Sequence, residues 1–311
     1  MGQVEALRGR LEGWWFAPGD PRRLAALRIG LGAVLCARLA TGRYLELAHQ
    51  PAALFRPISF LRLLHAMPPP GVIALVQAVA LAAALLATAG VWARVALPLA
   101  WVAAVPLIAM TSSLGKTVHN DVLLLLCLFP LLPARTADAW SLAVRRRVAH
   151  AGWPYGWPVR TATAVVAGAY FFSGLAKLLH AGPAWVTGGN LRWVLYASSD
   201  AQAHPNPAAL LVADRPWLAH LLAAATLLVE LGFPLVLWRP RLAWVLVPAV
   251  AGLHAGIWAA MRLDYWPMVA TVVVVMVDWA ALADRLAGRR AGPQTAEARS
   301  RDPAVRAAAD R

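Results

Sequence analysis

Residues 159–179, VRTATAVVAGAYFFSGLAKLL, decide the fold class, because this stretch is long and apolar enough to cross a lipid bilayer. A membrane helix needs about 20 mainly apolar residues. The composition of the whole chain agrees: of 311 residues, 60% are hydrophobic and only 14% are charged. Soluble domains carry about 25% charged residues. The sequence therefore predicts an all-α fold, a polytopic integral membrane helical bundle.

Further apolar stretches of the same kind bring the expected number of transmembrane helices to about eight. The first stretch is interrupted by Arg28 and Arg38, and the fourth is short and contains Pro130. These two stretches give the weakest prediction of a spanning helix. The stretches lie at about 24–41, 71–91, 95–112, 121–134, 159–179, 217–238, 242–261 and 265–283.

The basic residues between these stretches predict the orientation. With a cytoplasmic amino terminus, the cytoplasmic loops hold more than twice as many basic residues as the outer loops. This is the direction of the positive-inside rule. We therefore expect a multi-pass protein of the cell membrane with both termini cytoplasmic. Its parts are an N-terminal segment over 1–23, a transmembrane domain over 24–284, and a basic, disordered tail over 285–311.

The net charge of +14 does not indicate a nucleic-acid partner, because the arginines cluster at the ends of apolar stretches. That placement fits anionic lipid headgroups, so membrane lipids are the expected partners and no protein partner can be named. The two cysteines, Cys36 and Cys127, both lie in apolar stretches. We read them as small buried residues and expect no metal site.

Two segments on the expected outer side are too long to be simple turns. They span about 42–70 and 180–216, and both mix aromatic and aliphatic residues with Gly and Pro. Segments of this kind lie at the membrane interface or re-enter it, and here they would cap the outer face. The alternative is plain anchoring of aromatic side chains at the headgroup level.

A few polar residues share one expected depth near the outer face. Lys177 lies close to the outer end of its span, His254 lies in the outward half of the seventh, and His119, Asn120 and Asp121 begin the fourth. Ionisable groups in spans cost about 2.5–3.5 kcal/mol each, so they persist when paired or when they line a wet cavity. A shared outward-facing pocket is the hypothesis. The alternatives are a snorkelling lysine and a packed, hydrogen-bonded histidine.

Three charged residues fall toward the expected inner half. They are Arg28, Glu230 and Asp278. We expect a structural charge cluster in which Glu230 and Asp278 neutralise Arg28. A coupled proton path is the alternative.

Lysine is rare in this chain, which makes Lys177 informative. Of 29 basic residues, only Lys116 and Lys177 are lysines. Arginine keeps its proton in proteins, whereas a desolvated lysine can approach neutrality near pH 7. Lys177 is therefore a candidate general base.

The stretch 170–191, YFFSGLAKLLHAGPAWVTGGNL, resembles the HTTM (horizontally transferred transmembrane) domain and, more distantly, the membrane part of vitamin K-dependent gamma-glutamyl carboxylase. Two further pieces are similar to that family and occur in the same order, HNDVLLLLCLF at 119–129 and GLHAGIWAAMRLDYWPMVA at 252–270. Glu230 before Gly-Phe-Pro also fits the HTTM pattern. The residues that match the main motif are Tyr170, Gly174, Lys177, Leu178, Trp185 and Gly188.

The resemblance implies carboxylase-like chemistry on a quinol. Lys177 would be the base that deprotonates reduced menaquinone or a vitamin K-like quinol, which enters from the lipid phase. His254, His119 and Asn120 would complete the catalytic group. The residues expected to bind substrate are Tyr170, Trp185 and Asp121.

The match to the carboxylase is incomplete, and other functions stay open. The sequence shows no large soluble domain after the spans. We therefore do not expect the chain to bind a propeptide as the carboxylase does. The main alternative is a non-catalytic membrane scaffold, or an immunity- or partner-binding protein. A transporter is a weaker alternative, because no inverted repeat and no matching pair of broken helices is evident.

Overall fold

The computed structural model describes residues 2–115, 119–143 and 150–288. Within these residues the chain is helical and contains no strand, only an isolated antiparallel bridge between Gly19 and Gly152. The prediction of an all-α chain is confirmed. The chain divides into two units, Met1–Met276 and Val277–Arg311, which are described separately.

Six helical segments in the described part of the chain are long and apolar enough to cross a membrane. A seventh would require α13 (Trp266–Met276) and α14 (Trp279–Leu286) to count as one broken span. The fourth expected span is a short helix, Val122–Leu131, made of α6 and η3. The membrane-helix character is thus supported, whereas the count of eight is not. The six segments are α2 (Pro21–Thr41), α4 (Pro70–Ala89), α5 (Ala93–Thr111), α7 (Trp153–Ala181), α11 with η4 (Pro216–Leu237) and η5 with α12 (Pro240–Met261).

Proline and glycine set the ends of several of these helices. Pro21, Pro70 and Pro216 each open a helix, where the missing N–H of proline has no consequence. The side chain of Asp20 accepts a hydrogen bond from the Arg22 amide and caps α2. At the other end of α4, Gly90 adopts φ of 78°, the left-handed conformation that closes helices.

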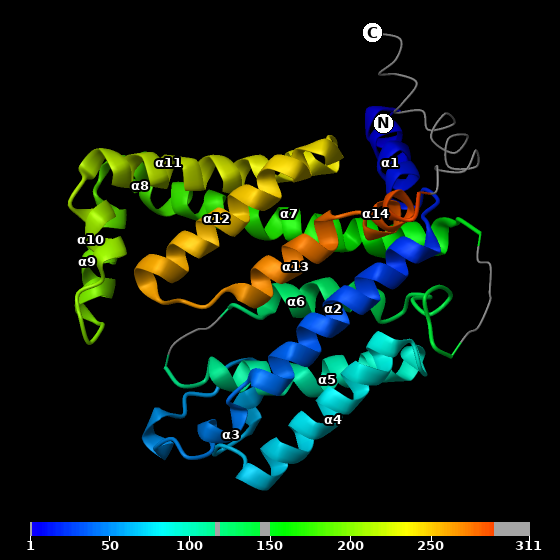
Figure 1. Cartoon of the computed structure of the whole chain (residues 1–311), viewed down its shortest axis with the longest axis horizontal. Coiled ribbons are helices and arrows are strands. Elements are labelled where there is room, and N and C mark those ends of the chain that lie inside the picture. Colours follow the sequence, from blue (N-terminus) through cyan, green and yellow to red (C-terminus); the bar gives the residue numbers. More distant parts are fainter. Residues whose placement is uncertain (1, 116–118, 144–149, 289–311) are drawn as a thin grey trace. The chain divides into compact units, whose positions relative to one another are not determined.

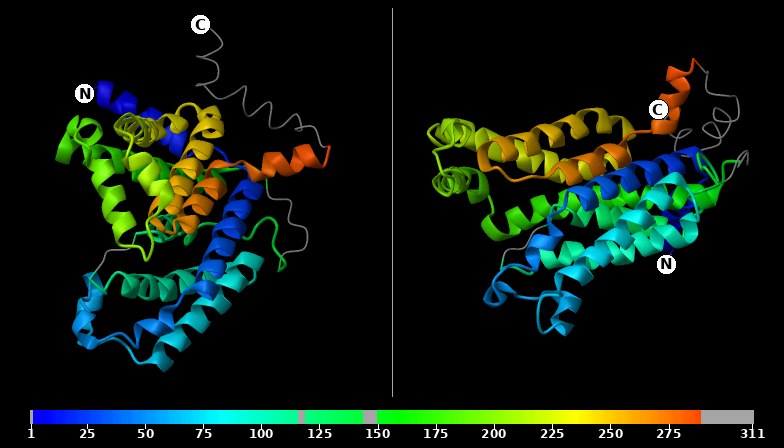
Figure 2. Two further views of the ribbon diagram at one scale, coloured as in Figure 1. Left: turned by 60° about the vertical axis from the view of Figure 1, so that its left-hand side comes forward. Right: turned by 60° about the horizontal axis from the view of Figure 1, so that its bottom comes forward.

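Helix α2 packs at the centre of the first unit, against α4, α6, α7 and α13 (Figures 1 and 2). Its buried face is a stripe of fully buried leucines that includes Leu24, Leu27 and Leu31. Helix α4 also packs against α5, and several of the buried residues on these two helices are alanines. Small side chains let membrane helices approach closely, which strengthens dispersion between them. The alanines concerned are Ala80, Ala83, Ala84 and Ala87 on α4 and Ala96, Ala100 and Ala104 on α5.

The connecting segments of the first unit gather at two opposite ends. One end holds residues 42–69, with α3 (Tyr44–Leu47), η1 (Ala52–Leu54) and η2 (Ser59–Leu63), and the short helices after α7 (Figure 1). Those short helices are α8 (Ala184–Thr187), α9 (Asn190–Asp200) and α10 (Pro207–Ala213). The opposite end holds α1 (Gly2–Trp15), which lies in the segment expected to precede the first span. The two segments expected to cap one face therefore do share one end.

The second unit contains the short helix α14. The side chain of Asp278 accepts a hydrogen bond from the Ala281 amide and caps this helix. Most of the predicted disordered tail, residues 289–311, lies outside the described residues, as does Lys116.

Candidate functional site

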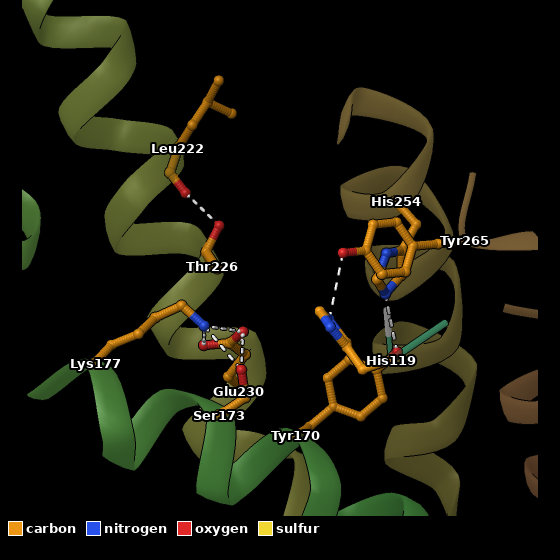
Figure 3. Close-up of polar contacts among 9 residues, drawn as sticks. All are labelled: His119, Tyr170, Ser173, Lys177, Leu222, Thr226, Glu230, His254 and Tyr265. Atoms are coloured by element: carbon orange, nitrogen blue, oxygen red, sulfur yellow. Dashed lines mark hydrogen bonds and ion pairs between the residues drawn. The ribbon is translucent and has the colours of Figure 1, made fainter. Parts of the chain in front are cut away.

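The ammonium of Lys177 is held in a compact polar group between α7 and α11 (Figure 3). Lys177 Nζ donates to Glu230 Oε1 at 2.6 Å and to Oε2 at 2.9 Å. It also donates to Ser173 Oγ at 2.8 Å, and Ser173 in turn donates to Glu230 Oε1 at 3.0 Å. One cation, one carboxylate and one hydroxyl thus form a closed hydrogen-bonded ring, hereafter the Lys177 group.

The Lys177 group lies between the two helices and is partly exposed at their lateral surface. The Glu230 side chain is 7% exposed and that of Lys177 is 20% exposed, while Ser173 is exposed. Gly174 makes the close approach of the two helices possible, because a Cβ there would lie 3.0 Å from Glu230 Cβ. The carboxylate therefore lies at the back of the group, and the lysine and serine lie toward the surface.

Trp185 covers the Lys177 ammonium from the direction of α8. Its ring centroid lies 5.5 Å from Lys177 Nζ, which is within cation–π range. The indole Nε1 of Trp185 is buried and has no hydrogen-bond partner among the described residues. A buried indole N–H normally finds an acceptor, so this donor is available to a ligand oxygen.

The expected charge cluster of Arg28, Glu230 and Asp278 is wrong in its pairing. Glu230 neutralises Lys177, not Arg28. Arg28 is fully buried, and its guanidinium donates to the backbone carbonyls of Thr136, Ala139 and Trp140. Several N–H groups in a rigid fork suit several carbonyls at once, which is why arginine can be held here.

A second polar group lies on the other side of the view in Figure 3 and joins α7 to α12. Tyr170 OH shares a hydrogen bond of 3.1 Å with His254 Nε2, and both residues are buried. Tyr265 packs its ring 5.0 Å from that of His254 and shares a 3.3 Å hydrogen bond with His119 Nε2. His254 Nδ1 is buried and has no partner among the described residues. We call these four residues the tyrosine–histidine group.

Asn120 and Asp121 bond to partners outside both groups. Asn120 donates its side-chain amide to the Asp264 carbonyl. Asp121 forms an ion pair with Arg38, whose Nε lies 2.7 Å from Asp121 Oδ1. Nearby, burial raises the pKa of Tyr44 to about 12, so its hydroxyl stays neutral. The structure therefore does not gather all of the predicted residues in one pocket.

A single face of α7 connects the Lys177 group with the tyrosine–histidine group. Tyr170, Ser173 and Lys177 are three and four residues apart, which places them in one row along the helix. Tyr170 also stacks on Phe233, just after α11, with ring centroids 4.8 Å apart. Both groups thus lie along the contact between α7 and the α11–η4 segment.

Four contributing residues were not singled out from the sequence: Ser173, Tyr265, Arg38 and Asp264. Ser173 lies one helical turn before Lys177, so helical spacing could have identified it. Tyr265 lies in the segment after α12, and its contact partner His119 is 146 residues earlier in the chain. Spacing alone carries no signal for such a contact.

Two cavities in the described part of the molecule lie away from both groups. A cavity of about 540 Å³ lies beside α9 and α10, and one of about 300 Å³ lies between α4 and α5. The residues that line them include none of the predicted site residues. Among the described residues, no cluster of three or more His, Cys, Asp or Glu side chains could hold a metal ion.

Comparison of the chain with family models, with characterised proteins and with solved structures finds no match.

Proposed function

We propose that this chain is an HTTM-type integral membrane protein whose Lys177 group binds the hydroxyl of a lipid-phase quinol and accepts its proton. The observation that carries the proposal is the contact of Lys177 Nζ with both oxygens of the buried Glu230 carboxylate, 2.6 and 2.9 Å away. Lys177 and Ser173 lie toward the flank of the helices, so a ligand can reach them from within a bilayer.

The residues around Lys177 fit a quinol of the menaquinol or vitamin K type. Trp185 Nε1 offers an unpartnered buried donor close to the Lys177 ammonium. This donor and the Lys177 ammonium suit one ring oxygen of a quinol, and the exposed apolar flanks of the helices suit its ring and tail. When bound, the quinol would supply the electrons for a reaction with oxygen.

Lys177 can act as a base only together with Glu230. In the structure its ammonium is bonded to the carboxylate, so the amine must first lose a proton. Transfer of one proton from Lys177 Nζ to Glu230 leaves a neutral amine beside a carboxylic acid. The amine then accepts the quinol hydroxyl proton and regains its charge. Arginine at position 177 would keep the ion pair but could not release the proton.

The test measures menaquinol bound to the purified protein and the rate at which oxygen consumes it. Lys177→Ala should abolish binding, because the ammonium and its contact with Trp185 are lost. Lys177→Arg should retain binding but lower the oxidation rate by about 100-fold or more, the contribution of a general base. A wild-type protein that binds no quinol, or a Lys177→Arg variant that oxidises it normally, would exclude the proposal.

A non-catalytic scaffold is the second candidate, and one observation favours it. Every polar atom of the Lys177–Glu230 pair already has a partner, and the pair ties α7 to α11. In that case the ion pair serves only packing. Lys177→Arg would then preserve the cellular role of the protein, and quinol would not bind to any variant.

A further inference from the structure

Helix α1 carries an apolar stripe that no part of the described chain covers along most of its length. Val4, Leu7 and Leu11 recur at intervals of three and four residues, so they lie on one face of the helix. Their side chains are 73%, 58% and 54% exposed. The stripe continues into Trp14 and Trp15 at the end of the helix. A helix of this length is marginal in water, so the uncovered stripe needs an apolar environment.

Charged residues border the stripe in the pattern of a membrane-surface helix. At about 100° per residue, Arg8 and Arg10 fall on opposite flanks of the stripe, and Glu5 and Glu12 lie farther from it. Arg8 donates to Glu12 Oε1 at 2.7 Å, which leaves Arg10 as the flanking arginine for a lipid. An arginine in this position keeps its stem along the apolar face while its guanidinium reaches the lipid phosphate oxygens.

The position of α1 fits the same environment. In Figure 1, α1 runs across the direction of α7 and α11, two of the six helices long enough to span a bilayer. The carboxyl end of α1 is tied to α7, because Arg160 donates to the Ala17 carbonyl at 2.6 Å and lies over the Trp14 ring. Only five residues separate α1 from the start of α2 at Pro21. The helix is therefore held at the level where a spanning segment enters the bilayer.

The end of the first unit that holds α1 is basic. The start of α5 and the segment around η5 lie at this end in Figure 1. They contribute the exposed residues Arg94, Arg239 and Arg241. Their charge complements an anionic surface. A second copy of α1 fits the stripe less well, because the repeat covers only two heptads and a stable coiled coil needs at least about three to four. We propose that α1 is an in-plane helix that docks on an anionic lipid surface through Val4, Leu7 and Leu11, with Arg10 bound to a lipid phosphate.

The test follows backbone amide hydrogen exchange of residues 2–15 in the full chain, with one copy per lipid nanodisc. In discs that contain phosphatidylglycerol, these amides should exchange about tenfold more slowly than in detergent micelles. Leu7→Asp should remove that protection. The matched control is Ala6→Asp, which introduces the same residue at an exposed position outside the stripe and should leave the protection in place.

The lipid charge is tested separately. Discs of phosphatidylcholine alone should give weaker protection than discs with phosphatidylglycerol, and Arg10→Gln should reduce that difference. Equal exchange in Leu7→Asp and Ala6→Asp would overturn the docking face. Equal protection in both lipids would overturn the anionic partner. Protection that appears only when two copies share a disc would assign the stripe to a second copy of the chain.

Discussion

Arg28 and Lys177 are both cations within spanning helices, and the structure neutralises them in different ways. Arg28 is fully buried and donates to three backbone carbonyls. Lys177 is partly exposed and pairs with the carboxylate of Glu230 and the hydroxyl of Ser173. Carbonyls cannot take a proton from arginine, whereas a carboxylate can take one from lysine. Arg28 is thus held by backbone carbonyls, whereas Lys177 is held by side chains that include a carboxylate on a second helix.

Arg28→Met tests these carbonyl contacts and should have the largest effect. It leaves the carbonyls of Thr136, Ala139 and Trp140 without their donor, so we expect the free energy of unfolding to fall by about 3 kcal/mol. Thermal unfolding of the purified protein in detergent would measure the loss. Arg28→Lys should recover less than half of it, because one ammonium cannot reach carbonyls that a guanidinium fork spans. A Met variant as stable as the wild type would contradict a stabilising role of these contacts.

A double-mutant cycle tests the pair of Lys177 and Glu230. Lys177→Met and Glu230→Gln should each lower the free energy of unfolding by about 2 kcal/mol, because Lys177→Met leaves the buried carboxylate unpaired and Glu230→Gln removes the charge that the ammonium faces. The double variant should lose clearly less than the sum, with a coupling energy of about 1–2 kcal/mol. Chemical unfolding of the four proteins would give this value. Additive losses would mean that the two side chains do not stabilise each other.

Gly174→Ala tests whether the close approach of α7 and α11 holds the pair together. The new Cβ would lie 3.0 Å from Glu230 Cβ and 3.1 Å from Leu231, so the helices must move apart. We expect a loss of about 1–2 kcal/mol in the free energy of unfolding.

Gly168→Ala, on the same helix, is the matched control for Gly174→Ala. Its Cβ would lie 3.8 Å from the Phe172 ring, an ordinary contact. Alanine is favoured over glycine in helices, so this variant should be neutral or stabilising by about 0.5–1 kcal/mol. Equal effects of the two substitutions would show that crowding at Gly174 is unimportant.

The length of the apolar stretches predicted most of the fold. The expected stretches 71–91 and 95–112 match α4 and α5 within two residues. The last expected span is not one continuous helix, because Asp278 caps a new helix inside it, so that the stretch contains α13 and α14. A carboxylate within an apolar stretch can mark the start of a new helix. A hydropathy average over the whole stretch does not reveal it.

The partner of Glu230 could not be predicted, because depth was counted from the ends of the spans. Lys177 lies about one turn before the end of α7, whereas Glu230 lies about four turns after the start of α11. Their contact shows that the two helices are staggered along their length. Counting from span ends assumes no stagger, and it therefore placed Glu230 beside Arg28.

Tyr170→Phe has the smallest expected effect and decides whether the two polar groups on α7 work together. The phenyl ring can keep its stacking on Phe233, while the hydrogen bond to His254 Nε2 is lost. We expect the free energy of unfolding to fall by about 1 kcal/mol. If quinol binding also weakens, the ligand contacts the tyrosine–histidine group as well as Lys177. If binding is unchanged, the ligand does not depend on the tyrosine–histidine group, and that group, like Arg28, serves to join segments of the chain.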